Sequence, residues 1–329
     1  MKILFWGTPE FAVPSLRVLD DEGFEIVGVV TQPDRPAGRG RRLTPSPVKE
    51  VALDLGLPVL TPDRPRGSDF LAELEALAPD LSVVVAYGHI LRPEVLDVPA
   101  RGSFNVHASL LPELRGAAPI NWAIARGLDV TGVTIMRMAE AMDAGPILHQ
   151  VPEPILPNET ASELTVRLSE LGAEALLEAL TLLGAGESEE VEQDHERATF
   201  APKVDRATAR MEWTRPALEL AWHVRGMDAV PGAWSELEGA PVKLFRPEVV
   251  SLGDLPAARA TGNGGPPEER QDPSAPAGTV LVADAEAGLV VATGESAIRF
   301  EEVQPPGKRR MGALDWIHGR GVREGQRFA

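Results

Sequence analysis

The first half of the chain alternates between short apolar runs and stretches with helical spacing, and this alternation restricts the possible fold most strongly. Residues 81–86, Leu-Ser-Val-Val-Val-Ala, are apolar on both faces, as expected for a strand in the middle of a parallel sheet. Strands that alternate with helices predict a parallel sheet covered by helices on both faces. We expect further strands at 3–6, 26–31, 59–60, 104–107 and 132–138, and helices at 11–22, 48–55, 70–77 and 121–125.

Ligands bind to sheets of this kind at the carboxyl ends of the strands. The chain places Gly7, Tyr87-Gly88, His107 and Asp143 after its predicted strands. The turn after the first strand, Gly-Thr-Pro-Glu-Phe-Ala, lacks the G-x-G-x-x-G pattern of dinucleotide-binding sheets. A nicotinamide-dependent oxidoreductase is therefore disfavoured.

The strand at 104–107 ends with two polar residues that face the same side. Asn105 and His107 alternate with Phe104 and Val106, so the amide and the imidazole lie next to each other. An amide donor beside a titratable ring at the end of a strand is suited to binding a carbonyl oxygen. Taken alone, the two residues fit a hydrogen-bonded polar pair without chemistry equally well.

Composition excludes several classes of site. The chain has no cysteine, which excludes disulfides, thiolate catalysis and cysteine-bound zinc, and its six histidines show no metal-binding spacing. The net charge of −17 repels phosphate at long range, so a nucleic-acid partner would need a local basic patch. No apolar run is long enough for a signal peptide or a membrane span, which predicts a cytoplasmic protein without membrane contact.

Residues 31–47 form the most basic segment of this acidic chain. They contain four arginines, four prolines and two glycines, a composition that cannot pack as a core element. A solvated surface loop is one interpretation. The alternative is an arm that binds an anion through its guanidinium groups, which match phosphate geometry.

The second half of the chain changes character after a long amphipathic helix predicted at 161–183. A helix at 213–225 is followed by short alternating runs at 242–246, 278–282, 288–293 and 297–302, which predict a small β-barrel. Two more basic clusters lie at 203–210 and 308–310, and residues 253–277 have the composition of a surface insertion.

Motifs along almost the whole chain resemble the methionyl-tRNA formyltransferase family, whose members use 10-formyltetrahydrofolate. The segments that carry the resemblance are Gly-Thr-Pro-Glu-Phe-Ala at 7–12, the loop 31–47, Val-Ala-Tyr-Gly at 85–88, Asn-Val-His at 105–107, Ser-Leu-Leu-Pro at 109–112, Arg-Gly-Ala-Ala-Pro-Ile at 115–120, Met-Asp-Ala-Gly at 142–145, Thr-Phe-Ala-Pro-Lys at 199–203 and Gly-Lys-Arg-Arg-Met at 307–311. The segment Ala139-Glu-Ala-Met142 departs from the family's pattern before the aspartate. This departure concerns the loop and not Asp143 itself.

The resemblance implies an α/β fold: a Rossmann-like, parallel-sheet formyltransferase domain at 1–190, a basic linker at 191–210, and an OB-like β-barrel domain at 211–329 that binds tRNA, with an insertion at about 253–277. The implied catalytic residues are Asn105, His107 and Asp143. The implied folate-binding residues are Ser109, Leu110, Leu111, Pro112, Tyr87, Gly88, Ile90 and Leu91. The implied tRNA-binding residues are Arg35, Arg39, Arg41, Arg42, Lys203, Arg206, Arg210, Lys308, Arg309 and Arg310.

The implied reaction transfers the formyl group of 10-formyltetrahydrofolate to the α-amino group of initiator methionyl-tRNA and releases tetrahydrofolate, with no metal. The implied protein is a monomer, and Arg39 is expected to reach the end of the acceptor stem. Fixed donors such as Asn105 and His107 can stabilise a tetrahedral oxyanion, and an imidazole can transfer protons near neutral pH. Formylation of a small amine and non-catalytic binding of folate or RNA are the alternatives.

Overall fold

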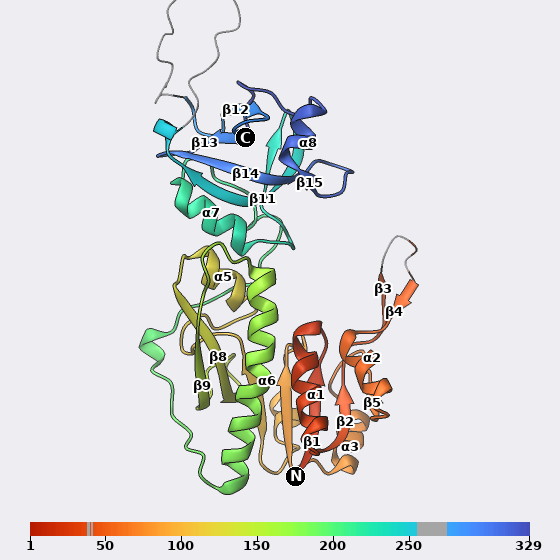
Figure 1. Cartoon of the computed structure of the whole chain (residues 1–329). Coiled ribbons are helices and arrows are strands. Elements are labelled where there is room, and N and C mark those ends of the chain that lie inside the picture. Colours follow the sequence, from red (N-terminus) through yellow and green to blue (C-terminus); the bar gives the residue numbers. More distant parts are fainter. Residues whose placement is uncertain (38–39, 41, 255–274) are drawn as a thin grey trace, which may run out of the picture. The chain divides into compact units, whose positions relative to one another are not determined.

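The computed structural model describes residues 1–37, 40, 42–254 and 275–329, which form two compact units (Figure 1). The first unit comprises residues 1–120, 129–155 and 163–202, and the second comprises residues 121–128, 156–162 and 203–329. Each unit builds its own sheet. Among the described helices, none is both long and apolar enough to cross a membrane.

The first unit contains a seven-stranded sheet in the order β5-β2-β1-β6-β7-β8-β9. The five strands from β5 to β7 are parallel, as the alternating pattern predicted. They are β1 (Lys2–Gly7), β2 (Glu25–Val30), β5 (Val59–Leu60), β6 (Leu81–Val85) and β7 (Ser103–His107).

The far edge of this sheet differs from the prediction. β8 (Val130–Arg137) is antiparallel to β7, and β9 (Ile147–Pro154), which was not predicted, is antiparallel to β8. β9 contains Pro152 and Pro154, and a strand with proline is tolerated at an edge because one side of it needs no ladder hydrogen bonds. The predicted parallel sheet is therefore confirmed from β5 to β7, and the strand predicted at 132–138 joins it in the antiparallel direction.

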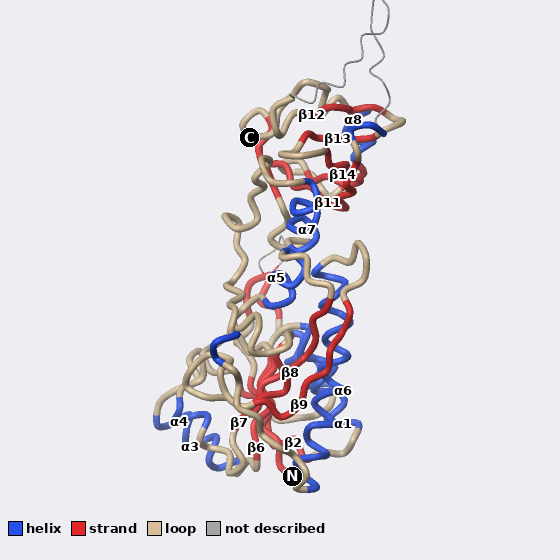
Figure 2. The backbone as a smooth tube through the Cα atoms, turned by 90° about the vertical axis from the view of Figure 1, so that its left-hand side faces the viewer, coloured by secondary structure: helices blue, strands red, loops and turns tan. Residues whose placement is uncertain are grey.

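Helices cover both faces of the sheet, as Figure 2 shows with α3 and α4 on one side and α1 and α6 on the other. On the α3 side, the rings of Trp6, Phe70 and Tyr87 pack edge to face in a cluster with buried aliphatic side chains. The helices are α1 (Val13–Asp21), preceded by η1 (Glu10–Ala12), α2 (Pro47–Asp54), α3 (Ser68–Leu77), α4 (Pro93–Leu96), α5 (Pro119–Ala125) and α6 (Ala161–Ala185), and η2 (His195–Arg197) follows.

The basic segment 31–47 contains a short pair of strands. β3 (Arg35–Ala37) and β4 (Arg42–Thr44) pair in an antiparallel hairpin, with Arg35 opposite Thr44. The hairpin leads directly into α2, whose first turn is capped because the Ser46 side chain accepts a hydrogen bond from the Lys49 amide. The segment therefore starts and ends on fixed structure.

The second unit contains an antiparallel sheet in the order β10-β11-β14-β13-β12, with β15 beside β14. The last residues of the chain bridge its two outer ends, because Phe328 pairs with Leu237 and Arg327 with Thr279. The predicted barrel is confirmed in this form. The elements are α7 (Ala217–Gly226), β10 (Trp234–Leu237), β11 (Ala240–Val250), η3 (Leu252–Asp254), β12 (Val280–Asp284), β13 (Gly288–Ala292), β14 (Ala297–Gln304), β15 (Met311–Gly312) and α8 (Ala313–His318).

The prediction of a helix from residue 213 was wrong at its start. α7 begins only after Pro216, whose fixed φ suits the beginning of a helix. Trp213 lies instead in the core of the second unit, where its ring contacts Phe300 and Phe328. The predicted insertion at 253–277 falls mostly on residues 255–274, which are outside the described residues.

Candidate active site

β7 brings Asn105 and His107 to one face of the sheet near its carboxyl end. Hydrogen bonding to β6 on one side and β8 on the other fixes the strand, with Asn105 beside Val84 and His107 beside Thr134. Asn105 is half-buried, and within the described residues no side-chain hydrogen bond occupies its amide. The amide is therefore available as a donor to a ligand.

His107 is 5% exposed, and its ring orientation is set by one hydrogen bond. Nε2 lies 3.0 Å from the carbonyl oxygen of Leu114. A carbonyl only accepts, so Nε2 carries the proton and the neutral ring presents its Nδ1 lone pair on the other side. Nδ1 can accept a proton there, and it becomes a donor once the ring is charged.

Asp143 lies on that other side, with 3.7 Å between Oδ2 and His107 Nδ1. The Gly116 amide donates to the same Oδ2 at 2.8 Å, which fixes the carboxylate. The backbone of Asp143 has a φ of 51°, a left-handed conformation that aspartate tolerates better than most residues. The structure thus brings the predicted pair within ion-pair distance.

The route by which Asp143 reaches His107 differs from the expected one. The sequence was interpreted as placing Asp143 at the carboxyl end of a parallel strand, but β8 is antiparallel and ends beside the start of β7, with Arg137 opposite Phe104. Residues 138–146 must therefore turn back along the sheet. The carboxylate arrives beside the imidazole through this loop and not through strand direction.

The segment Ser109–Pro112 is fixed to β8 and β9. The Thr134 hydroxyl donates to the Ser109 carbonyl at 2.6 Å and accepts from the Leu111 amide at 3.1 Å. Gln150 donates to the Leu111 carbonyl at 2.9 Å. Thr134 and Gln150 were not singled out from the sequence, since only the pairing of β8 with β9 brings them here. Leu110 and Pro112 are both half-buried in the same segment.

The loop after β6 is fixed in a similar way. The Tyr87 carbonyl accepts from the Thr8 hydroxyl and from Gln32 Nε2, both at 2.9 Å. Gly88 has a φ of 87°, and a side chain there would collide with the Gln32 amide, so this position requires glycine. Ile90 is 77% exposed whereas Leu91 is buried. Ile90 is thus free to contact a ligand, and Leu91 supports the loop from the core.

Tyr87 is 2% exposed, and burial raises the pKa of its hydroxyl to about 12. Among the described residues, no group forms a hydrogen bond with that hydroxyl. Its ring packs edge to face on Trp6 at 5.2 Å. The hydroxyl is therefore protonated near neutral pH, and its hydrogen-bonding capacity is unused.

The predicted arginines of the β3–β4 hairpin divide into two groups. Arg35 and Arg42 are exposed, and Arg35 Nη2 donates to Gln32 Oε1 at 2.5 Å, which connects the hairpin to the loop that holds Tyr87. Arg39 and Arg41 lie outside the described residues. The start of the hairpin is therefore connected to the Tyr87 carbonyl through the Gln32 side chain.

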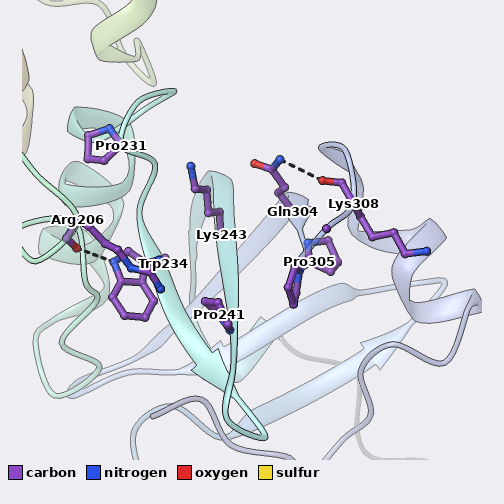
Figure 3. A pocket seen from close by; sticks show the side chains of 10 residues that line it. Arg206, Pro231, Trp234, Pro241, Lys243, Gln304, Pro305 and Lys308 are labelled. Carbon is purple, nitrogen blue, oxygen red and sulfur yellow. Dashed lines mark hydrogen bonds between the residues drawn. The ribbon is translucent and has the colours of Figure 1, made fainter. Parts of the chain in front are cut away.

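A groove of about 410 Å³ in the second unit brings together two of the predicted basic clusters (Figure 3). Arg206 stacks over the Trp234 ring at 4.5 Å, and the indole N–H donates to the Arg206 carbonyl at 2.6 Å. Lys308 lines the same groove, and so does Lys243 of β11. Lys243 was not predicted, because a single lysine in a strand carries no signal.

The other predicted cations differ in their surroundings. Lys203, Arg210 and Arg309 are exposed, and Arg210 also lies near the Trp234 ring. Arg310 instead bonds to Asp228 at 3.0 Å and to Glu302 at 2.5 Å, and it stacks on Phe245. We therefore assign Arg310 a structural role, while the exposed cations remain available to an anionic ligand.

Comparison with known proteins decides the family. Residues 1–180 match the family model of the formyl transferases, and residues 203–321 match that of their C-terminal domain. The chain is 45% identical over 329 residues to the methionyl-tRNA formyltransferase of Symbiobacterium thermophilum, covering all of this chain and 95% of that protein. Identity to the enzyme of the same name from a Synechococcus species is 44%, covering 100% and 98%.

The chain belongs to the methionyl-tRNA formyltransferase family. Solved structures of two more distant proteins share its fold. HypX from Aquifex aeolicus, solved in complex with tetrahydrofolic acid, has a TM-score of 0.62 at 20% identity, covering 98% of this chain and 48% of that one. The N-formyltransferase from Helicobacter canadensis, solved with folinic acid and dTDP-3-aminofucose, has a TM-score of 0.64 at 16% identity, covering 91% and 98%.

No metal centre accompanies this site among the residues that the structure describes. Groups of three or more histidine, aspartate or glutamate side chains with the spacing of a metal site do not occur there. The polar groups that converge on the site are an amide, an imidazole and a carboxylate. This set provides hydrogen-bond donation, proton transfer and charge stabilisation.

Proposed function

We propose that this protein transfers the formyl group of 10-formyltetrahydrofolate to the α-amino group of initiator methionyl-tRNA and releases tetrahydrofolate. The observation that carries the proposal is the juxtaposition of Asn105, His107 and Asp143 in a chain that is 45% identical, over its full length, to a methionyl-tRNA formyltransferase. Asn105 and His107 share one face of β7, and Asp143 lies 3.7 Å from the imidazole.

The three side chains account for the chemistry. When the amine nitrogen bonds to the formyl carbon, negative charge develops on the formyl oxygen, and the unoccupied Asn105 amide can donate to it. Nδ1 of His107 can take a proton from the amine, since Nε2–H is held by Leu114. The imidazolium so formed lies beside the Asp143 carboxylate, which stabilises it. His107 can then return the proton to N10 of the folate as the C–N10 bond breaks.

The folate would lie between the two loops that adjoin the sheet. Thr134 of β8 and Gln150 of β9 hold Ser109–Pro112, whereas Thr8, which follows β1, and Gln32, which follows β2, hold Tyr87–Leu91. Fixed backbone groups can recognise the donors and acceptors of a pterin ring without charge.

The acceptor is assigned from the basic surfaces. The exposed Arg35 and Arg42 of the β3–β4 hairpin, with Arg39 and Arg41 outside the described residues, provide guanidinium groups in the first unit. In the second unit, the groove provides the guanidinium group of Arg206 and the ammonium groups of Lys243 and Lys308. A polyanion with two separate contact regions explains local positive charge in a chain of net charge −17.

The proposed substrate also indicates where the protein acts. Aminoacylated initiator tRNA is used by ribosomes, so we expect the protein in the cytoplasm. We propose separately that it acts as a monomer. For the domain organisation we keep a formyltransferase domain at 1–190, a linker at 191–210 and a barrel domain at 211–329. Light scattering of the purified protein would test the assembly state, with a dimer mass contradicting the monomer.

The decisive assay offers 10-formyltetrahydrofolate with three acceptors: initiator methionyl-tRNA, an elongator methionyl-tRNA, and free amines such as an amino sugar nucleotide or glycinamide ribonucleotide. We expect transfer to the initiator tRNA alone at an appreciable rate. Formylation of a small amine without formylation of tRNA would overturn the proposed function. It would favour the alternative in which the acceptor is a small amine.

A further inference from the structure

Gln193 is a buried side chain whose hydrogen bonds converge on the turn that carries Asp143. It lies between α6 and η2 and is 5% exposed. Its Nε2 donates to the carbonyl oxygens of Asp143 at 3.0 Å and Gly145 at 2.7 Å. Its Oε1 accepts from Arg115, at 3.1 Å from Nε and 2.6 Å from Nη2. The amide therefore uses both donors and both acceptor positions.

These partners fix the chemical identity of the side chain. A guanidinium group only donates and a carbonyl only accepts, so the amide has one possible orientation. Glutamate could accept from Arg115 but could not donate to the two carbonyls. Asparagine has the same groups on a side chain one carbon shorter. Only glutamine has both the required length and the required donors and acceptors.

The bonds of Gln193 close a ring around Asp143. Arg115 is followed by Gly116, whose amide donates to the Asp143 carboxylate at 2.8 Å. Gln193 binds Arg115 on one side and the Asp143 backbone on the other. The main chain and the carboxylate of Asp143 are thus held by one connected support. The left-handed φ of Asp143 needs such support, since this conformation is disfavoured for L-residues.

We propose that Gln193 is a positioning residue, which holds the Asp143 carboxylate at the distance from His107 that formyl transfer requires. The role rests on the proposed function, because it matters for catalysis only if Asp143 and His107 act in the reaction. Gln193 itself need not touch either substrate. Its effect should appear in the rate of the chemical step and not in the binding of tRNA or folate.

The test uses Gln193→Glu in the full-length chain, with Glu192→Gln at the exposed neighbouring position as control. Gln193→Glu keeps the contact with Arg115 and places a carboxylate against two carbonyls. We expect the single-turnover rate of formyl transfer to fall about 10- to 100-fold, with KM for tRNA and for folate within twofold of the original. The control should retain the original rate.

A second readout does not depend on activity. The amide proton of Gly116 reports its hydrogen bond to Asp143, so its NMR resonance should shift upfield and exchange faster in Gln193→Glu. An unmoved Gly116 resonance, or an unchanged transfer rate, overturns the positioning role. Failure of the unmodified protein to formylate methionyl-tRNA would instead overturn the proposed function.

If Gln193→Glu does not fold, as judged by near-ultraviolet circular dichroism, Gln193→Asn replaces it. This variant keeps the amide but cannot reach all four partners. We expect a rate at least about threefold lower and a displaced Gly116 resonance. The original rate together with the original resonance would again overturn the role.

Discussion

Replacing Asp143 by asparagine removes one charge from the site and changes little else. Asparagine has the same shape, tolerates the left-handed φ of 51°, and can still accept from the Gly116 amide. The lost interaction is the one between the carboxylate and the imidazolium that forms on His107. The variant therefore isolates the electrostatic contribution of Asp143 from its structural one.

The size of the effect follows from the separation of the two groups. Two unit charges 3.7 Å apart interact by about 4.5 kcal/mol at an effective dielectric constant near 20. Asp143 is 15% exposed, so solvent screens part of this attraction. If about 2.7 kcal/mol of the attraction remains after screening, removing it lowers the rate roughly hundredfold, since each 1.36 kcal/mol is a factor of ten. We expect that loss in the chemical step.

The measurement is a single-turnover assay with the protein in excess over initiator methionyl-tRNA at saturating 10-formyltetrahydrofolate. Glu140→Gln is the matched control, because it removes the same charge from an exposed position in the same loop. The control should keep the original rate. The reasoning fails if Asp143→Asn remains within about threefold of the original protein, or if both variants lose the same amount.

Three further predictions concern other parts of the molecule. Asn105→Ala should slow the chemical step about 100- to 1,000-fold, the scale of a lost oxyanion donor, with no change in KM for tRNA in the same single-turnover assay. Lys243→Ala should weaken tRNA binding and make the slope of log K against log salt shallower by about one, measured by filter binding, whereas a purely structural Lys243 would leave the slope intact. Tyr87, the one tyrosine of the chain, should titrate near pH 12 at 295 nm when folded and near 10 when unfolded.

The tyrosine prediction also has a consequence for stability. The pKa of Tyr87 is raised in the folded state, so its contribution to the free energy of unfolding is complete below about pH 10. This contribution is lost as the pH rises from about 10 to about 12, at up to about 1.4 kcal/mol per pH unit. A folded-state midpoint near 10 would show that the hydroxyl is not buried.

Strand and helix positions in the first unit were predictable because apolar periodicity is a local signal. Residues 81–86 are apolar on both faces, and the strand found there, β6, is central and parallel. The direction of β8 is not local. It depends on the pairing of Thr134 with His107, which an apolar run can satisfy in either direction. β9 escaped prediction for a related reason, since an edge strand has no continuous apolar face.

The candidate site shows the same difference between residues that a local pattern predicts and residues that only the folded chain brings together. Asn105 and His107 are two residues apart on one strand, so alternation alone placed them together. Asp143 came from the resemblance, and only the folded chain gives its separation from His107. Gln193 carried no signal, because one glutamine in an acidic, irregular segment looks like any solvated side chain. Its role is visible only through its contacts with Arg115 and the turn at Asp143.

The segment after α6 determines where this chain can be joined to the second unit of a related protein. Val191 pairs with Ile147, the Thr199 hydroxyl accepts from the Leu114 amide, and the Ala201 amide donates to the Arg115 carbonyl, all within the first unit. In a chimaera joined at residue 180, where the first family match ends, the residues that make these contacts would come from the relative. A junction placed after Pro202 would transfer residues 203–329, the main part of the second unit, and leave the candidate active site its own supports.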